Sequence, residues 1–299
     1  MSQNVLVELS DALADAAEKA GKATVLVNAR RRIPASGIAY ASDLVLTADH
    51  IVEREEDITV ILADGTEIPA KVAGRDAGSD LAVLKLERGA GTVAEATKSS
   101  ARLGQIALVL GRPSRDGIEA SLGTVSAIGG PIRTGRGGML ERYIRTDSIS
   151  YPGFSGGPLV AADGTVLGVN TSGLARGTAI TVPADIAWNI AETLVKHGHI
   201  KRGYLGIRSQ TVEIPDASQK SLKREQATGL LILGVENNSP ASKSGFIVGD
   251  ILVAVAGTPV LHHDELFARL NGDVAGKSTP IEILRGGQPQ TLNVLIGER

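Results

Sequence analysis

Between residues 22 and 182 the chain alternates short apolar runs with residues that favour turns. Gly, Pro, Asp and Asn punctuate the runs, and many short strands at such spacing are typical of an all-β barrel or sandwich. We therefore predict a mainly β fold over this region. The expected strands are Thr24–Val27, Gly37–Tyr40, Leu44–Thr47, Ile58–Leu62, Ile68–Val72, Leu81–Leu86, Ile106–Leu110, Ala120–Ile128, Tyr143–Thr146, Leu159–Val160, Val166–Asn170 and Ala179–Val182.

Residues 3–20 have helical spacing instead, and Gly21 can end the helix. We assign residues 1–21 to a short N-terminal helix. Its apolar stripe has to be buried against the barrel or a neighbouring subunit, and its acidic polar face argues against membrane binding. The stripe consists of Leu6, Leu9, Leu13, Ala16, Ala17 and Ala20.

A second helix is expected over 184–197, with Gly198 as its stop signal. A domain boundary follows near 199–202. The length of 299 residues indicates about two domains, so we assign 22–198 to the first and 203–299 to the second. Within the second domain, the polar segment 213–228 is expected to be a loop between strands.

The composition limits which partners and which kinds of site the chain can have. Hydrophobic residues make up 42% and charged residues 21% of the chain, a balance that can build a globular core. The net charge of −2 gives no electrostatic reason to expect nucleic acid as a partner. The absence of cysteine excludes disulfides and thiolate metal sites. The five histidines are scattered, and we expect no metal site.

Three short motifs carry residues suited to acyl transfer through a serine nucleophile. Ser155 lies between glycines, and His50 and Asp80 precede it in that order. A serine hydroxyl is a poor nucleophile until a base takes its proton. His50 is the candidate base, and Asp80 would orient its ring. Each motif alone also has a structural explanation, as a turn, a buried histidine or a strand cap, but the three together favour catalysis.

The glycine-rich turn would also supply an oxyanion hole. Backbone N–H groups of Gly153 and Ser155 can converge on one point and stabilise a tetrahedral intermediate. A side chain at position 153 would oppose the turn that aims these donors. We therefore predict His50, Asp80 and Ser155 as catalytic residues, with oxyanion donors at Gly153 and Ser155.

These motifs resemble the HtrA/Deg family of trypsin-like serine proteases. The matching stretches are Leu44–Val52, Gly78–Leu86, Thr146–Leu159, Gly203–Ile207 and Ser239–Leu252. The resemblance implies a chymotrypsin-like pair of six-stranded β-barrels followed by a PDZ domain, catalysis without a cofactor, and degradation of unfolded or misfolded proteins. It also implies a homo-oligomer, usually a trimer formed through N-terminal contacts.

The resemblance also places the substrate. An extended chain would pair beside Asn170, Thr171 and Ser172, which selects unfolded or flexible polypeptides. Thr171, Gly173 and Ile180 would wall the pocket for the residue before the cleaved bond. Because these residues are small or apolar, we expect cleavage after small or medium aliphatic residues rather than after Lys or Arg.

The second domain resembles a PDZ domain, which binds an extended peptide as an added strand and captures its terminal carboxylate with backbone N–H groups. Leu266 and Leu270, one helical turn apart, would line the side-chain pocket. The alternative is a small β domain that only packs on the protease. The residues that match the carboxylate-binding loop are Tyr204, Leu205, Gly206 and Ile207.

The chain departs from the family pattern at three places. Asp49 stands before the histidine, where its carboxylate either perturbs His50 or points to solvent. Phe154 precedes the serine and is expected to fill space under the turn, with altered substrate access as the alternative. The segment Gly111–Gly117 lacks a Phe that usually helps to shape the specificity pocket. A catalytically silent or latent chaperone or scaffold is therefore the competing hypothesis.

The N-terminal region carries no targeting pattern. Residues 1–4 lack a basic region, and Glu8, Asp11 and Asp15 interrupt any apolar stretch. Neither a signal peptide nor a membrane-spanning helix is expected. We therefore expect a cytoplasmic protein if Met1 is native, with a periplasmic protein whose leader has been removed as the alternative.

Overall fold

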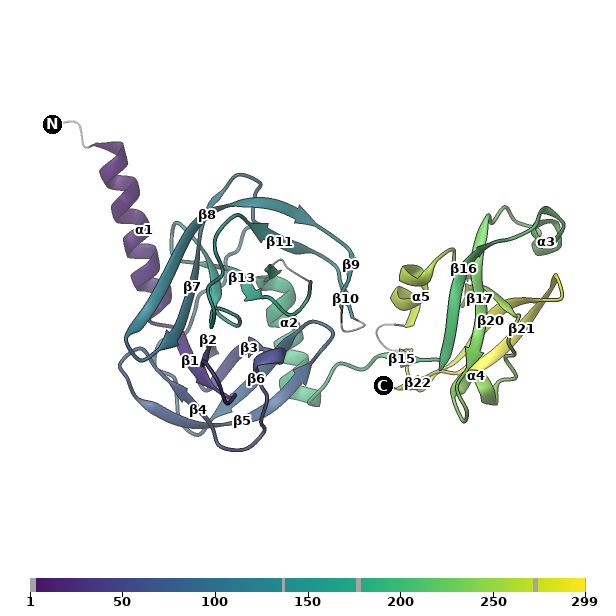
Figure 1. The fold of residues 1–299 in the computed structure, drawn as a ribbon, viewed down its shortest axis with the longest axis horizontal. Coiled ribbons are helices and arrows are strands. Elements are labelled where there is room, and N and C mark those ends of the chain that lie inside the picture. Colours follow the sequence, from purple (N-terminus) through teal and green to yellow (C-terminus); the bar gives the residue numbers. More distant parts are fainter. Residues whose placement is uncertain (1–3, 136–137, 176–178, 271–273, 299) are drawn as a thin grey trace. The chain divides into compact units, whose positions relative to one another are not determined.

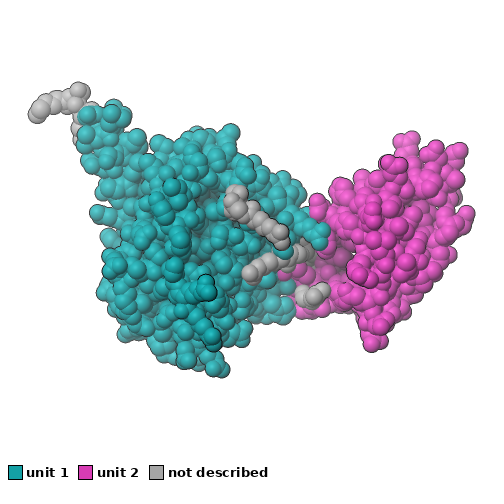
Figure 2. Space-filling model, viewed as in Figure 1, with its two compact units in different colours: residues 1–200 teal, residues 201–299 magenta. Residues whose placement is uncertain are grey.

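A computed structural model describes residues 4–135, 138–175, 179–270 and 274–298. The chain divides into two compact units, Met1–Ile200 and Lys201–Arg299, which Figure 2 colours separately. Each unit has its own hydrophobic core. Parts of the predicted helix 1–21 and of the predicted domains 22–198 and 203–299 lie outside the described residues, namely residues 1–3, 136–137, 176–178, 271–273 and 299.

The first barrel of unit 1 is a closed sheet of six strands in the order β1-β2-β3-β6-β5-β4 (Figure 1). Its interior is filled by Val, Ile, Leu and Ala side chains, which pack well on the inside of a small barrel. The strands are β1 (Thr24–Asn28), β2 (Ala35–Ala41), β3 (Leu44–Ala48), β4 (Ile58–Ile61), β5 (Glu67–Asp76) and β6 (Leu81–Leu86).

The second barrel is also closed, with the order β11-β14-β13-β12-β7-β8. A two-stranded ribbon, β9 (Ile132–Arg133) with β10 (Met139–Leu140), lies between β8 and β11 in sequence. The expected double barrel is thus confirmed. The barrel strands are β7 (Ile106–Ser114), β8 (Gly117–Gly129), β11 (Tyr143–Thr146), β12 (Pro158–Ala161), β13 (Val166–Thr171) and β14 (Ile180–Pro183).

Helix α2 (Ala184–His197) joins the two barrels through a shared core. It ends at Gly198, which adopts a φ of 79° and donates its N–H to the Leu194 carbonyl oxygen. A residue in this left-handed conformation is a common helix stop. The buried members of the shared core come from α2, from both barrels and from segments beside them, and include Leu46, Leu81, Val169, Val182, Ala187, Ala191 and Leu194.

Helix α1 (Val5–Gly21) is seated on the second barrel by its C-terminal half only. Ala16 and Ala20 are buried in a cluster with Leu108, Leu110 and Val160. The N-terminal half of the apolar stripe stays exposed in this single chain, because no described segment covers it. Its exposed apolar side chains are Val5, Leu6, Val7 and Leu9.

Unit 2 is built on a sheet in which β16, β17, β18, β20 and β21 follow one another in that order. Strand β16 lies at one end of this order, and β19 pairs with β18. A separate pair joins β15 to β22. The elements are β15 (Gly203–Tyr204), β16 (Ile207–Glu213), α3 (Asp216–Leu222), β17 (Thr228–Val235), α4 (Pro240–Lys243), β18 (Ile251–Val255), β19 (Thr258–Pro259), α5 (His263–Leu270), β20 (Ser278–Arg285), β21 (Gln288–Leu295) and β22 (Gly297–Glu298).

The expected loop over 213–228 is wrong, because this segment contains helix α3. Leu222 closes the helix and is buried in a cluster with Ile214, Val253 and Leu284. The segment offers only two large apolar side chains, too few for a helical period to be visible in the sequence. Contacts with the sheet, rather than local pattern, stabilise this helix.

Candidate active site

Antiparallel pairing of β3 with β6 brings His50 and Asp80 together. Ala48 lies opposite Leu81 at the end of this pair. His50 follows in a short 3₁₀ turn directly after β3, and Asp80 directly precedes β6. The amide N–H of Asp49 donates to the Asp80 carbonyl oxygen at 3.0 Å, which continues the ladder beyond the strands and sets the two side chains face to face.

The Asp80 carboxylate holds His50 at two points. Its Oδ2 lies 2.7 Å from His50 Nδ1, and its Oδ1 accepts a hydrogen bond from the His50 backbone N–H at 2.9 Å. Asp80 is fully buried, whereas the His50 side chain is 19% exposed. A buried carboxylate at Nδ1 fixes the ring orientation and favours the tautomer whose Nε2 can accept a proton.

Two residues of the second barrel close over this pair. The Thr171 hydroxyl donates to Asp80 Oδ2 and accepts a hydrogen bond from the Gly173 N–H at 2.9 Å. A Cβ at Gly173 would lie 2.7 Å from His50 Nδ1 and closer still to Asp80 Oδ2. Only glycine fits at position 173 without displacing the pair. Thr171, expected to wall a substrate pocket, is buried with its hydroxyl on Asp80.

Ser155 lies in the turn before β12, next to β13. The turn is tied to β13 because the Gly156 N–H donates to the Asn170 carbonyl oxygen at 2.8 Å. Ser155 Oγ lies 3.2 Å from Ser172 Oγ, and no hydrogen bond joins Ser155 to His50 among the described residues. Catalytic hydrogen bonds are often formed only when substrate is bound, so the open geometry does not exclude Ser155 as nucleophile.

The turn presents two backbone donors, one on each side of Phe154. Neither the Gly153 nor the Ser155 N–H donates to an acceptor within the described part of the chain, whereas the Phe154 N–H between them donates to the Tyr151 carbonyl oxygen at 3.0 Å. Gly153 adopts a φ of 92°, and a Cβ there would lie 2.6 Å from the Cβ of Pro113. The turn therefore requires glycine and leaves two N–H groups available to a ligand.

Ser36, a residue that the sequence analysis missed, anchors this turn from the first barrel. Its hydroxyl donates to the Gly153 carbonyl oxygen at 2.7 Å, and its N–H donates to the Ser155 carbonyl oxygen at 3.2 Å. The Thr47 hydroxyl in turn donates to the Ser36 carbonyl oxygen at 2.7 Å. Nothing in the sequence near Ser36 distinguishes it from any small residue at the start of a strand.

Phe154 fills the space beneath the turn, as expected. Its ring is fully buried and meets the Tyr151 ring edge-on, with the ring centres 5.4 Å apart. A Cβ at Gly111 would lie 2.8 Å from Phe154 Cγ. The absence of a side chain at 111 therefore makes room for the aromatic ring.

Asp49 does not point to solvent. It is 2% exposed, and its Oδ1 accepts a hydrogen bond from Arg75 Nε at 2.6 Å. The Arg75 guanidinium also donates to the Val52 carbonyl oxygen at 3.1 Å, so it spans the turn that carries His50. The signal available in the sequence was an acidic residue at 49 and a basic residue at 75, but no rule of spacing links them.

The remaining residues expected to bind substrate differ in accessibility. Ser172 is exposed and Gly173 partly exposed, whereas Asn170 and Ile180 are buried. The Asn170 side chain donates to the Gly157 carbonyl oxygen at 3.2 Å and accepts from the Thr181 hydroxyl at 2.6 Å. Its backbone is engaged with the same turn, because the Asn170 N–H donates to the Gly157 carbonyl oxygen at 2.9 Å and its carbonyl oxygen accepts from the Gly156 N–H. Asn170 therefore braces the turn that carries Ser155.

In unit 2, the four expected loop residues lead into β16. Leu205 is buried in the core with Leu266 and Leu270, and its carbonyl oxygen accepts from the Ala241 N–H at 2.9 Å. Gly206 adopts a φ of 78°. Tyr204 pairs with Gly297 between β15 and β22, and Ile207 begins β16.

His263, at the start of α5, reaches β16, and the sequence analysis missed this contact. Its Nε2 lies 3.1 Å from both the hydroxyl and the carbonyl oxygen of Ser209. Helix α5 and strand β16 are therefore in direct contact through His263 and Ser209. The sequence places His263 only at a helix start, because the partner lies 54 residues away.

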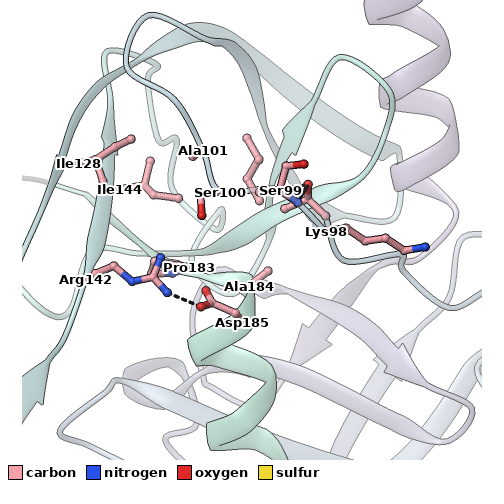
Figure 3. Close-up of a pocket in the computed structure, with 12 residues that line it drawn as sticks. Lys98, Ser99, Ser100, Ala101, Ile128, Arg142, Ile144, Pro183, Ala184 and Asp185 are labelled. Atoms are coloured by element: carbon pink, nitrogen blue, oxygen red, sulfur yellow. Dashed lines mark hydrogen bonds and ion pairs between the residues drawn. The ribbon is translucent and has the colours of Figure 1, made fainter.

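A pocket elsewhere on the second barrel contains none of the residues predicted for the site (Figure 3). Residues 97–101, β8, β11 and the start of α2 line it, and Arg142 forms an ion pair with Asp185 at its edge. Across the described ranges we find no cluster of three or more His, Asp or Glu side chains that could hold a metal ion. In the same ranges, no helix is long and apolar enough to cross a membrane.

Comparison with known proteins agrees with this architecture. Residues 35–169 match the trypsin-like peptidase domain family and residues 203–296 match the PDZ domain family. A protein of Rhizobium meliloti (strain 1021), named "Probable periplasmic serine endoprotease DegP-like", is 33% identical over 276 residues, which cover 90% of this chain and 54% of the relative. The chain spans about half the length of the curated relatives it matches.

Solved structures cover the chain more fully. The HtrA-type protease AlgW with a decapeptide superposes with a TM-score of 0.79 at 25% identity, covering 96% of this chain and 98% of that one. The serine endoprotease from Yersinia pestis gives the same TM-score and coverage at 27% identity. The two units are therefore a trypsin-like peptidase domain and a PDZ domain. The chain belongs to the HtrA/Deg family of serine proteases.

The expected cytoplasmic location is wrong. The relatives from Rhizobium and Pseudomonas are named as periplasmic endoproteases. The prediction had relied on the residues at the N-terminus of the sequence, which carry less information about location than the family does.

Proposed function

We propose that this chain is a serine endopeptidase that cleaves unfolded or misfolded polypeptides. Ser155 attacks the substrate carbonyl carbon while His50 takes its proton, and His50 then returns the proton to the leaving amine. Asp80 stabilises the imidazolium, and the N–H groups of Gly153 and Ser155 bind the oxyanion. The two-point hydrogen bonding of Asp80 to His50 carries this proposal, because it supplies an oriented base.

An extended substrate lies beside residues 170–172 of β13 and the segment after it. Backbone pairing of this kind is open only to chains that can present a strand, which favours unfolded proteins. Gly173 and Ile180 bound the pocket for the residue before the cleaved bond. We therefore propose cleavage after small or medium aliphatic residues.

The PDZ domain is proposed to bind peptides with a free C-terminus and to regulate the protease. A peptide strand would add to β16, beside α5, with its carboxylate at residues 204–207. The position of β16 at one end of the sheet order supports this proposal. The whole chain is proposed to form homo-oligomers, and the apolar end of α1 supports a contact between copies.

A catalytically latent chaperone or scaffold is the second candidate. Its support is the Ser155 hydroxyl, which lies 3.2 Å from Ser172 Oγ rather than on His50. If this contact withholds the nucleophile, Ser172→Ala raises the rate at which Ser155 reacts. If Ser155 moves freely onto His50, Ser172→Ala leaves that rate unchanged.

The deciding experiment compares casein cleavage by the wild type, Ser155→Ala and Ser99→Ala, with mass spectrometry after treatment with a fluorophosphonate probe. An endopeptidase cleaves casein and is labelled at Ser155, and Ser155→Ala loses about 10³-fold or more in rate. Ser99→Ala serves as the matched serine control. An unlabelled wild type that nevertheless prevents aggregation of an unfolded protein supports the latent chaperone.

Peptide capture is tested separately by fluorescence anisotropy. The probe is a labelled decapeptide that ends in valine with a free carboxylate, and the control is the same peptide amidated at its C-terminus. Binding of the free acid and loss of binding on amidation support carboxylate capture. Equal binding of both forms contradicts it.

A further inference from the structure

Arg112 is a buried cation whose partners are main-chain carbonyls. It lies in β7, is 8% exposed, and its guanidinium donates to the carbonyl oxygens of Thr24 at 2.8 Å and Gly21 at 3.3 Å. Within the described residues no carboxylate pairs with it, and burial lowers the pKa of Arg112 below its ordinary value. Gly21 is the last residue of α1 and Thr24 the first of β1, so Arg112 joins the end of the helix to the start of the strand that follows it. The last carbonyls of a helix form the negative end of its dipole, which favours a cation there.

The backbone of Arg112 leads from that helix end to the serine turn. Its N–H donates to Ser36 Oγ at 2.8 Å, and the same hydroxyl donates to the Gly153 carbonyl oxygen at 2.7 Å. Ser36 is fully buried and also donates its N–H to the Ser155 carbonyl oxygen at 3.2 Å. One hydroxyl therefore connects the strand that receives α1 with the peptide group that precedes Phe154.

Strand β7 contacts α1 through Leu108 and Leu110, and it contacts Ser36 through Arg112. Ala20 is buried against the second barrel, and the Thr24 hydroxyl donates to the Ala20 carbonyl oxygen at 2.9 Å. A Cβ at Gly21 would lie 2.6 Å from Ile118 Cδ1, so the helix end is closely packed. If α1 leaves its seat, Arg112 loses the Gly21 carbonyl and keeps only the Thr24 carbonyl in β1, so part of a buried guanidinium is left without an acceptor. That loss favours a shift of β7.

We propose that Arg112 and Ser36 are positioning residues that couple the seating of α1 to the conformation of the Gly153–Ser155 turn. Seated, α1 holds Arg112 in place, and Ser36 keeps the Gly153 and Ser155 N–H groups aimed at the oxyanion. When α1 is unseated, the hydrogen bonds from Arg112 to Ser36 and from Ser36 to Gly153 weaken, and the Gly153 and Ser155 N–H groups lose their alignment. The catalytic part of this proposal rests on the proposed peptidase function.

Kinetics per active site distinguish this role from a purely structural one. In the full chain, Arg112→Met, Ser36→Ala and Ala20→Glu each lower kcat per titrated active site about tenfold, with little change in KM, because displacing an oxyanion donor costs less than the 10²–10³ of removing one. Arg112→Lys, which keeps one donor, retains most of the rate. Unchanged kcat per titrated site in Arg112→Met, with only a lower melting temperature, overturns the proposal.

A double variant tests the coupling itself. If α1 acts through Arg112, Arg112→Met combined with Ala20→Glu loses no more than the more severe single variant. Multiplicative losses show independent effects and contradict the coupling.

Hydrogen exchange followed by mass spectrometry tests the coupling without relying on activity. Deuterium uptake in a peptide covering 150–157 rises in Arg112→Met and in Ala20→Glu, and it stays at the wild-type level in Arg142→Met. Arg142 is the matched control because it lies on the same barrel and pairs with Asp185 at the start of α2 (Figure 3). Raised uptake in a protein that neither cleaves nor labels would refute the peptidase and leave the coupling standing. Unchanged uptake refutes the coupling in either case.

Discussion

Arg75 ties the buried carboxylate of Asp49 to the end of helix α2. Its guanidinium reaches Asp49 Oδ1 at 2.6 Å, and its backbone N–H donates to the Gly198 carbonyl oxygen at 3.0 Å. Gly74 beside it has no room for a side chain, because a Cβ there would lie 2.8 Å from the Gly198 carbonyl oxygen. Residues 74 and 75 of β5 therefore support both the turn that carries His50 and the end of α2.

Loss of the Arg75 guanidinium should destabilise unit 1. Arg75→Ala removes the guanidinium that pairs with the buried Asp49 carboxylate, and we expect the free energy of unfolding to fall by about 2 kcal/mol. Trp188, the one tryptophan in the chain, reports on unit 1 in urea titrations. The double variant Arg75→Ala with Asp49→Ala should recover at least half of the loss, and a double variant as unstable as the single would contradict the pairing.

A methyl group at position 173 should disable the site without unfolding the domain. In Gly173→Ala the new Cβ displaces either His50 or Asp80, so we expect kcat/KM and the rate of fluorophosphonate labelling to fall about 100-fold, as for other losses of ångström-scale alignment. Gly135→Ala is the matched control, because its Cβ meets only the Leu174 carbonyl oxygen at 3.7 Å. Full activity in Gly173→Ala would show that the observed pair is not the catalytic one.

For kcat, the hydroxyl of Thr171 should matter more than the volume of its side chain. Thr171→Val keeps the volume but removes the donor to the fully buried Asp80 carboxylate, and we expect kcat to fall about tenfold, consistent with a charge-assisted hydrogen bond of about 1.5–3 kcal/mol. Thr171→Ser keeps the hydroxyl and should stay near the wild type. If Thr171 serves instead as a pocket wall, both variants change the preference for the cleaved residue rather than kcat.

Stability should decline at high pH because of Tyr40. Burial, with Glu192 and Asp43 nearby, raises the pKa of Tyr40 to about 12, whereas an unfolded tyrosine titrates near 10. The folded state thus keeps a proton that the unfolded state loses, and stability falls as the pH rises from about 10 to about 12. Tyr40→Phe should flatten this part of the profile of unfolding free energy against pH. Equal slopes for both proteins would contradict the assignment.

Local pattern was sufficient for the barrel strands and for α2, and it put the candidate catalytic residues in chain order. Alternating runs located the barrel strands, and Gly198 marked the end of α2 as the sequence predicted. The pairing of His50 with Asp80 was accessible because both residues flank strands that turned out to be neighbours in the first barrel. Chemistry and chain order together specified those two residues.

The supporting contacts could not be predicted, because each joins residues far apart in the sequence. Ser36 reaches Gly153 across 117 residues, and Thr171 reaches Asp80 across 91. A serine or threonine at the start or end of a strand has no periodic signature that would reveal such a partner. Helix α3 was missed for the same reason, since its burial depends on Val253 and Leu284 in other strands.

The candidate catalytic groups come from both barrels, with His50 and Asp80 on the first and Gly153 and Ser155 on the second. A small slide of one barrel over the shared core would separate them while leaving every strand intact. On heating, peptidase activity should therefore be lost at a temperature several degrees below the melting temperature of the secondary structure. The catalytic rate, measured as a function of temperature, would then report on the alignment of the two barrels.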